Sequence, residues 1–273
     1  MAEEEAGSND PKIRWRREIH SLISAVIFSV VIAFIFQSWE MAWLITLSLV
    51  FHELGHILAI SRLGLDWELG FNILGAWTMT SRRARQALSD YRNSIIHLAG
   101  PFASLLLAGL TYLIAVLVVP GEQRQIWLRL ANFNALLCVL NLLPMGSLSD
   151  GGKFVRRLFS SADERLEERL LALVGVVPLV FACIILTIRL DWARVLSLLV
   201  IVLWFGLSML VESRLDDPTK STTPKAMKPR QARELLSAMI LVLLASMALV
   251  VITPFWINPE HIAKMIIQFS VSL

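Results

Sequence analysis

Long apolar stretches constrain this 273-residue chain more than any other feature of its sequence. A helix needs about 20 mostly apolar residues to cross the hydrocarbon core of a bilayer. Seven stretches have that character, and 56% of the residues are hydrophobic, against about 45–50% in soluble domains. They predict an all-α polytopic membrane protein with six to seven transmembrane helices. The predicted spans are 21–38, 41–62, 94–119, 128–148, 168–188, 193–211 and 234–256, of which 128–148 is interrupted by asparagines.

Basic residues gather in alternate loops of this predicted topology. They lie before the first span and after the second, fourth and sixth, whereas the loops at 39–40, 120–127 and 189–192 carry few. The positive-inside rule then places the N-terminus in the cytoplasm and explains the basic residues without a nucleic-acid partner. An acidic leader and the lack of a small-residue cleavage site favour an uncleaved anchor over a signal peptide.

Composition divides the chain into four parts. Residues 1–20 are predicted to form a cytoplasmic N-terminal segment and 21–211 a membrane core; 212–233 form a cytoplasmic linker and 234–273 an accessory transmembrane helix with a C-terminal tail. Within the core, "DWELGFNILGAWTMT" (66–80) alternates partially and carries two glycines. This pattern predicts a small β-hairpin or re-entrant element between the second and third helices.

The second predicted span carries ionisable residues in "LVFHELGHILAI" (49–60). His52 and His56 are four residues apart, so on a helix both imidazoles project from one face. Two such nitrogens can bind one Zn²⁺ at about 2.0–2.1 Å, and Glu53 beside them can act as a general base on water. The alternative, polar residues facing a helix bundle, is disfavoured because a carboxylate at the bilayer centre costs about 2.5 kcal/mol or more.

A catalytic zinc takes three protein ligands, and the sequence leaves the third open. Asp150 lies in "NLLPMGSLSDGGKF", where Pro144 ends a helix and Gly151–Gly152 allow a tight turn at the end of an apolar span. An ordinary turn aspartate is the competing interpretation. Further candidates near the predicted membrane borders are Glu40, Asp66, Asp90 and His97.

Three stretches in order, "FHELGHILAISRLGL", "HLAGPFASLLLAGL" and "NLLPMGSLSDGGKF", resemble the site-2 protease family of intramembrane zinc metalloproteases over about residues 41–157. The resemblance implies that the core at 21–211 is an intramembrane metalloprotease. It implies His52, His56 and Asp150 as zinc ligands, Glu53 as the catalytic glutamate and Asn141 as a residue near the substrate carbonyl.

The sequence departs from the family pattern between Asn141 and Asp150. Family members commonly have one residue fewer in this interval and a leucine directly before the acid, where this chain has Ser149. A longer turn can still deliver the carboxylate, so the departure weakens the assignment of Asn141 more than that of Asp150.

The resemblance implies a zinc metalloendopeptidase that cleaves membrane-protein substrates in or near their transmembrane segments. It also implies a prokaryotic plasma membrane, with the active site toward the cytoplasm; the oligomeric state stays open. Strands within 66–80 would offer an edge for an extended substrate. The alternative is a non-proteolytic metal-binding membrane protein, either a transporter or a substrate-binding adaptor, because intramembrane His, Glu and Asp also mark ion pathways. A transporter commonly shows repeated halves, which the sequence lacks.

Overall fold

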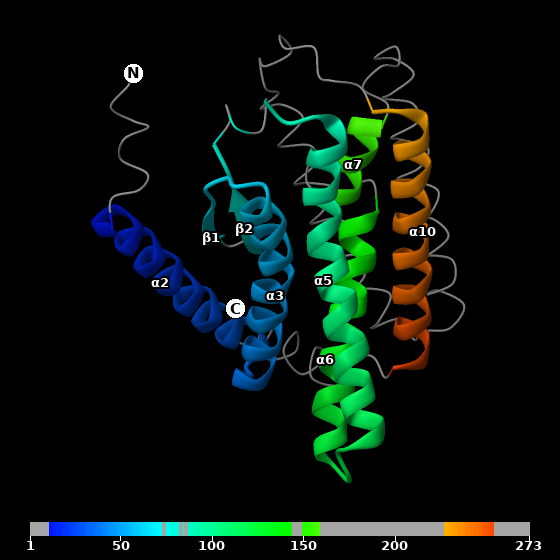
Figure 1. Ribbon diagram of the computed structural model, residues 1–273. Coiled ribbons are helices and arrows are strands. Elements are labelled where there is room, and N and C mark those ends of the chain that lie inside the picture. Colours follow the sequence, from blue (N-terminus) through cyan, green and yellow to red (C-terminus); the bar gives the residue numbers. More distant parts are fainter. Residues whose placement is uncertain are drawn as a thin grey trace, which may run out of the picture.

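The computed structural model describes residues 11–72, 75–81, 84, 87–143, 149–158 and 227–253, and this part of the chain is mostly helical. Its elements are α2 (Pro11–Phe36), α3 (Trp39–Arg62), β1 (Glu68–Asn72), β2 (Gly75–Met79), α5 (Asp90–Leu117), α6 (Gln123–Leu142), α7 (Asp150–Leu158) and α10 (Pro229–Ile252). Helices α3, α5, α6 and α10 run alongside one another, and α2 slants beside α3 (Figure 1).

Three helices, α3, α5 and α10, are long and apolar enough to cross a membrane by their length and composition. They agree with the spans predicted at 41–62, 94–119 and 234–256. Helix α10 begins at Pro229, so the last residues of the predicted linker are helical. The spans predicted at 168–188 and 193–211 lie outside the described residues. Three candidate spans are therefore established, and the predicted total of six to seven is not.

The other two long helices depart from their predicted bounds. Helix α2 ends at Phe36, and its apolar part, Glu18–Phe34, is shorter than the three candidate spans. Helix α6 ends at Leu142 instead of continuing through 148. Two of its asparagines are fully buried and bond to neighbouring helices: Asn132 donates to the Thr253 hydroxyl at 2.8 Å and Asn134 to the Ser48 hydroxyl at 2.8 Å. Interhelical bonds of this kind let polar side chains lie inside a helix bundle.

The predicted hairpin is confirmed as a two-stranded antiparallel sheet of β1 and β2, with Gly70 opposite Trp77. A Cβ on Gly70 would lie 2.3 Å from the Trp77 ring, so the glycine makes room for the indole. An isolated hairpin is marginally stable, but this one contacts helices on both sides. Strand β1 contacts α2, where the Ser21 hydroxyl donates to the Leu69 carbonyl, and β2 contacts α3.

Close helix approach brings α3 and α5 together. A Cβ on Gly55 would lie 2.3 Å from the Ala99 carbonyl oxygen and 2.8 Å from the Ala103 Cβ. Small residues at such an interface let two membrane helices approach within backbone contact. This contact holds the part of α3 that carries His52 and His56 against α5.

The expectation of a tight turn at Asp150 is wrong, because Asp150, Gly151 and Gly152 begin helix α7. Ser149 explains the difference, since its hydroxyl accepts the Gly152 N–H at 3.0 Å and donates to the Leu143 carbonyl at 2.6 Å. A serine in this position caps a helix start, as leucine would not. A Cβ on Gly151 would lie 2.0 Å from the Leu142 carbonyl oxygen, so this glycine permits close approach to α6.

Candidate metal centre

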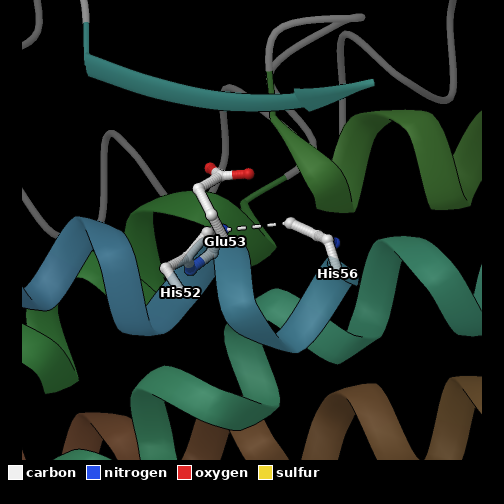
Figure 2. A group of neighbouring side chains, drawn as sticks. All are labelled: His52, Glu53 and His56. Carbon is white, nitrogen blue, oxygen red and sulfur yellow. Dashed lines mark hydrogen bonds between the residues drawn. The ribbon is translucent and has the colours of Figure 1, made fainter. Parts of the chain in front are cut away.

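Helix α3 presents His52, Glu53 and His56 side by side in the interior of the helical bundle (Figure 2). All three are buried, with exposed fractions of 3%, 6% and 7%. Their ligand atoms lie within 4.8 Å of one another, which is close enough to hold a metal ion. A local helical spacing therefore produces the first part of the site, as the sequence predicted.

The two imidazoles converge on one carboxylate oxygen from α7. The Nε2 atoms of His52 and His56 lie 3.3 Å apart, the contact drawn as a dashed line in Figure 2. Each Nε2 lies 3.1 Å from Oδ2 of Asp150. A tetrahedral zinc with bonds of about 2.0–2.1 Å holds its ligand atoms about 3.3–3.4 Å apart, so these three donors fit zinc in both type and spacing.

The outer nitrogens of the histidines are held by α5. His56 Nδ1 donates to the Ile96 carbonyl at 2.7 Å, and His52 Nδ1 lies 2.9 Å from the Ser104 hydroxyl. A carbonyl only accepts, so a neutral His56 ring carries its proton on Nδ1 and leaves the Nε2 lone pair facing Asp150. Two acceptors 3.1 Å apart require a cation or a proton between them, which is what a metal site supplies.

The charge of Asp150 suits the same role. Burial alone would raise the pKa of its carboxyl group, yet the positive charge of a protonated His56, together with hydrogen bonds from His52, His56 and His97, outweighs it and holds the pKa well below its usual range. The Asp150 carboxylate is consequently ionised and available as a ligand.

Gly100 of α5 keeps the space beside the two Nε2 atoms open. A Cβ at this position would lie 2.2 Å from Nε2 of His56 and 2.7 Å from Nε2 of His52, although α5 is otherwise continuous there. Gly109 lies on the same helix, and a Cβ there would meet no atom within 4 Å. The two glycines thus differ in their surroundings while sharing a helical backbone.

The Gly100→Ala variant is expected to weaken zinc binding at least about tenfold, because the new methyl group displaces an imidazole from its ligand position. Zinc affinity of the purified protein, measured by competition with a chromophoric chelator, checks this. Gly109→Ala is the matched control and should bind zinc as the wild type does. Equal affinity in Gly100→Ala and wild type would contradict the placement of the metal beside α5.

The Glu53 side chain leaves α3 in a different direction from the two imidazole rings (Figure 2), although its carboxylate still lies within 4.8 Å of their ligand atoms. No hydrogen bond or ion pair to it occurs among the described residues. The Asp150 oxygen touches both Nε2 atoms, so Asp150 is better placed than Glu53 to complete the donor set. Glu53 is left beside the site with its carboxylate available.

The other candidates for third ligand lie elsewhere. The Glu40 carboxylate pairs with Arg129 at 3.2 Å on the surface, Asp66 is exposed, and the Asp90 carboxylate pairs with Arg157 at 3.2 Å. His97 lies closer, with Nδ1 3.7 Å from Oδ1 of Asp150, on the far oxygen from the two imidazoles. His97 thus faces Oδ1 of Asp150, whereas the imidazoles of His52 and His56 face Oδ2.

Asn141 is half-buried near the end of α6, and its amide donates to the Leu137 carbonyl at 3.0 Å. Among the described residues, no hydrogen bond joins it to His52, His56 or Asp150.

Ser104 was not identified from the sequence as a partner of His52, although its spacing in the sequence indicated it. His97, Gly100 and Ser104 lie three and four residues apart and so share one face of α5.

Comparison with known proteins adds a structural neighbour. The chain is similar to the site-2 protease from Methanocaldococcus jannaschii, with 20% sequence identity, coverage of 74% of this chain and 93% of that chain, and a TM-score of 0.47. No family model and no curated protein matches the chain. The neighbour bears the name of the family whose motifs the sequence resembles.

Proposed function

We propose that this protein is an intramembrane zinc metalloprotease of the site-2 type, which hydrolyses peptide bonds in or near transmembrane segments of other membrane proteins. The observation that carries the proposal is the convergence of His52, His56 and Asp150 on one point, with mutual distances of 3.1–3.3 Å between donor atoms. Three protein ligands leave one position of a tetrahedral zinc open, as in catalytic sites, whereas structural sites are closed by four.

The residues around this point divide the chemistry between them. His52, His56 and Asp150 would hold Zn²⁺, which when bound supplies Lewis-acid polarisation of a carbonyl and activation of water near neutral pH. Glu53 accepts the proton of the attacking water and passes it to the leaving amine. The Ile96 carbonyl and the Ser104 hydroxyl keep the two imidazoles in their orientations.

The apolar surroundings indicate the substrate. Helix α3 buries the histidines inside a segment with the length and composition of a membrane span. A peptide bond in a transmembrane helix is shielded by that helix's own hydrogen bonds, so a substrate must unwind before cleavage. We infer that the substrate is a membrane-spanning segment which reaches the site in an extended form.

Among the described residues, no third strand pairs with the hairpin. The Leu69 carbonyl accepts a hydrogen bond from Ser21 of α2, so it points away from β2. Residue pairs in an antiparallel ladder alternate between hydrogen-bonded and non-hydrogen-bonded. Leu69 pairs with Thr78, so Thr78 belongs to a non-hydrogen-bonded pair, and so does Ala76 two residues before it. The backbone N–H and C=O groups of Thr78 and Ala76 therefore point away from β1. Helix α2 occupies the outer side of β1 at Leu69, which leaves β2, the strand beside α3, for pairing with a substrate.

Ala76→Pro is expected to lower cleavage several-fold, because proline removes an outward N–H while sparing the hydrogen bonds between β1 and β2. Ala76→Ser keeps the N–H and serves as the matched control. The measurement is the rate of cleavage of a membrane-embedded test substrate, with zinc content as a check on the site. Unchanged cleavage by the proline variant would contradict pairing on β2.

The proposal as a whole is tested by reconstituting the purified protein in lipid vesicles with a polypeptide that contains one transmembrane segment. Wild-type protein should cleave it, and the Glu53→Gln variant should not. Zinc binding without cleavage of any membrane segment would favour a transporter or a substrate-binding adaptor. The charge distribution further supports a cytoplasmic N-terminus, with the site toward that side.

A further inference from the structure

Helix α7, which carries Asp150, contacts α5 through two polar pairs at its two ends. His97 Nδ1 of α5 lies 3.7 Å from Oδ1 of Asp150, the first residue of α7. Arg157 Nη1, from the next-to-last residue of α7, lies 3.2 Å from Oδ1 of Asp90, the first residue of α5. Each pair joins an early residue of one helix to a later residue of the other, so the two helices meet antiparallel.

The spacing of the two pairs is the same on both helices. Asp90 and His97 are seven residues apart on α5, and Asp150 and Arg157 are seven apart on α7. Seven residues are about two helical turns, which returns a side chain to nearly the same face. One contact would leave α7 able to rotate about it, whereas two contacts on one face fix both its position and its rotation.

Burial distinguishes the Asp90–Arg157 pair from an ordinary surface ion pair. The Asp90 side chain is 0% exposed, and a buried carboxylate that loses a cationic partner is strongly destabilised. Arg129 and Glu40 form a pair of equal length, 3.2 Å, but their side chains are 36% and 44% exposed. Exposed ion pairs of this kind contribute little to stability. The Arg129–Glu40 pair therefore serves as a matched comparison for the buried Asp90–Arg157 pair.

We propose that His97 and the Asp90–Arg157 pair are positioning residues of the metal centre, which clamp α7 on α5 and hold the Asp150 carboxylate against His52 and His56. Asp150 uses its two oxygens differently, with Oδ2 on the imidazoles and Oδ1 toward His97. A nine-residue helix is marginal by itself, so its ligand depends on such contacts for its place. This inference rests on the proposed zinc site.

The test uses the full-length protein, purified in detergent and stripped of metal, with Zn²⁺ affinity measured by chelator competition. Arg157→Gln and Asp90→Asn are each expected to bind zinc about 10–100-fold more weakly, the usual effect of losing a group that orients a metal ligand. The double variant should lose less than the sum of the two single effects, because both remove the Asp90–Arg157 contact. Arg129→Gln is the control and should leave the affinity unchanged.

A second readout separates positioning from general destabilisation. In the Co²⁺-substituted protein, His97→Ala and Arg157→Gln should change the visible ligand-field spectrum, and His97→Gln should restore part of it because its amide N–H can still face Oδ1 of Asp150. Circular dichroism reports whether each variant is folded. Should Asp90→Asn fail to fold, Arg157→Gln carries the test, because its guanidinium is more exposed than the carboxylate.

Folded His97→Ala and Arg157→Gln variants with wild-type zinc affinity and spectrum would overturn the inference and leave the proposed protease untouched. A wild-type protein that binds no zinc would instead contradict the proposed function, and this inference with it. The expected result is a loss of zinc affinity in the variants of His97, Asp90 and Arg157 and no loss in Arg129→Gln.

Discussion

The Glu53→Gln variant is expected to bind zinc as the wild type does and to lose cleavage by a factor of about 10²–10⁴, the usual contribution of a general base. Glutamine has nearly the shape of glutamate but cannot accept the proton of the attacking water. Zinc should stay because the donors that converge at 3.1 Å belong to His52, His56 and Asp150, and Glu53 is not one of them.

The measurement is cleavage of a membrane-embedded test substrate together with the zinc content of the same preparation. Glu40→Gln is the matched control, because Glu40 lies in the first turn of the same helix and is exposed. It should leave both quantities unchanged. Cleavage by the Glu53→Gln variant would contradict the proposed mechanism. Loss of zinc from that variant would indicate that Glu53 is a ligand.

The second large effect is expected at Asp150. The Asp150→Ala variant should lose zinc affinity by more than about 100-fold, beyond the usual effect of a residue that only orients a ligand, and should lose cleavage with it. The reason is that Oδ2 of Asp150 is 3.1 Å from both Nε2 atoms, so its removal leaves only two donors. Two donors do not make the three-ligand site of a catalytic zinc.

Zinc affinity by chelator competition again gives the measurement. Asp66→Ala is a suitable control, since Asp66 was also a candidate from sequence and lies exposed in the segment after α3. Its affinity should equal that of the wild type. Unchanged affinity in Asp150→Ala, followed by loss of zinc when His97→Ala is added, would identify His97 as the third ligand.

The parts of the site that lie close together in sequence were predictable. His52, Glu53 and His56 fall within five residues, and the helical repeat alone places both imidazoles on one face. The hairpin at β1 and β2 was predictable for a similar reason, because alternation and glycines act over a few residues. Three of the predicted spans were also visible as apolar composition, which needs no knowledge of what each helix contacts.

The start of α7 shows where local reasoning fails. The two glycines after Asp150 suggested a tight turn, but the Ser149 hydroxyl caps a helix there and Gly151 lets it approach the Leu142 carbonyl. A glycine pair is compatible with both structures in isolation. The Ser149 cap selects the helix, and the close approach of Gly151 to α6 is a packing contact that a glycine pair does not reveal.

The sequence by itself determined the two-histidine motif, its glutamate and its apolar setting, because each depends on neighbours within a few helical turns. Only the tertiary structure decided that Asp150 meets both histidines, that Ile96 and Ser104 hold their outer nitrogens, and that His97 faces the second carboxylate oxygen. These contacts join α3, α5 and α7 across 40 to 98 residues of chain. Two packing interfaces set these contacts: small residues between α3 and α5, and the docking of α7 on α5. Each interface depends on the shapes of whole helices.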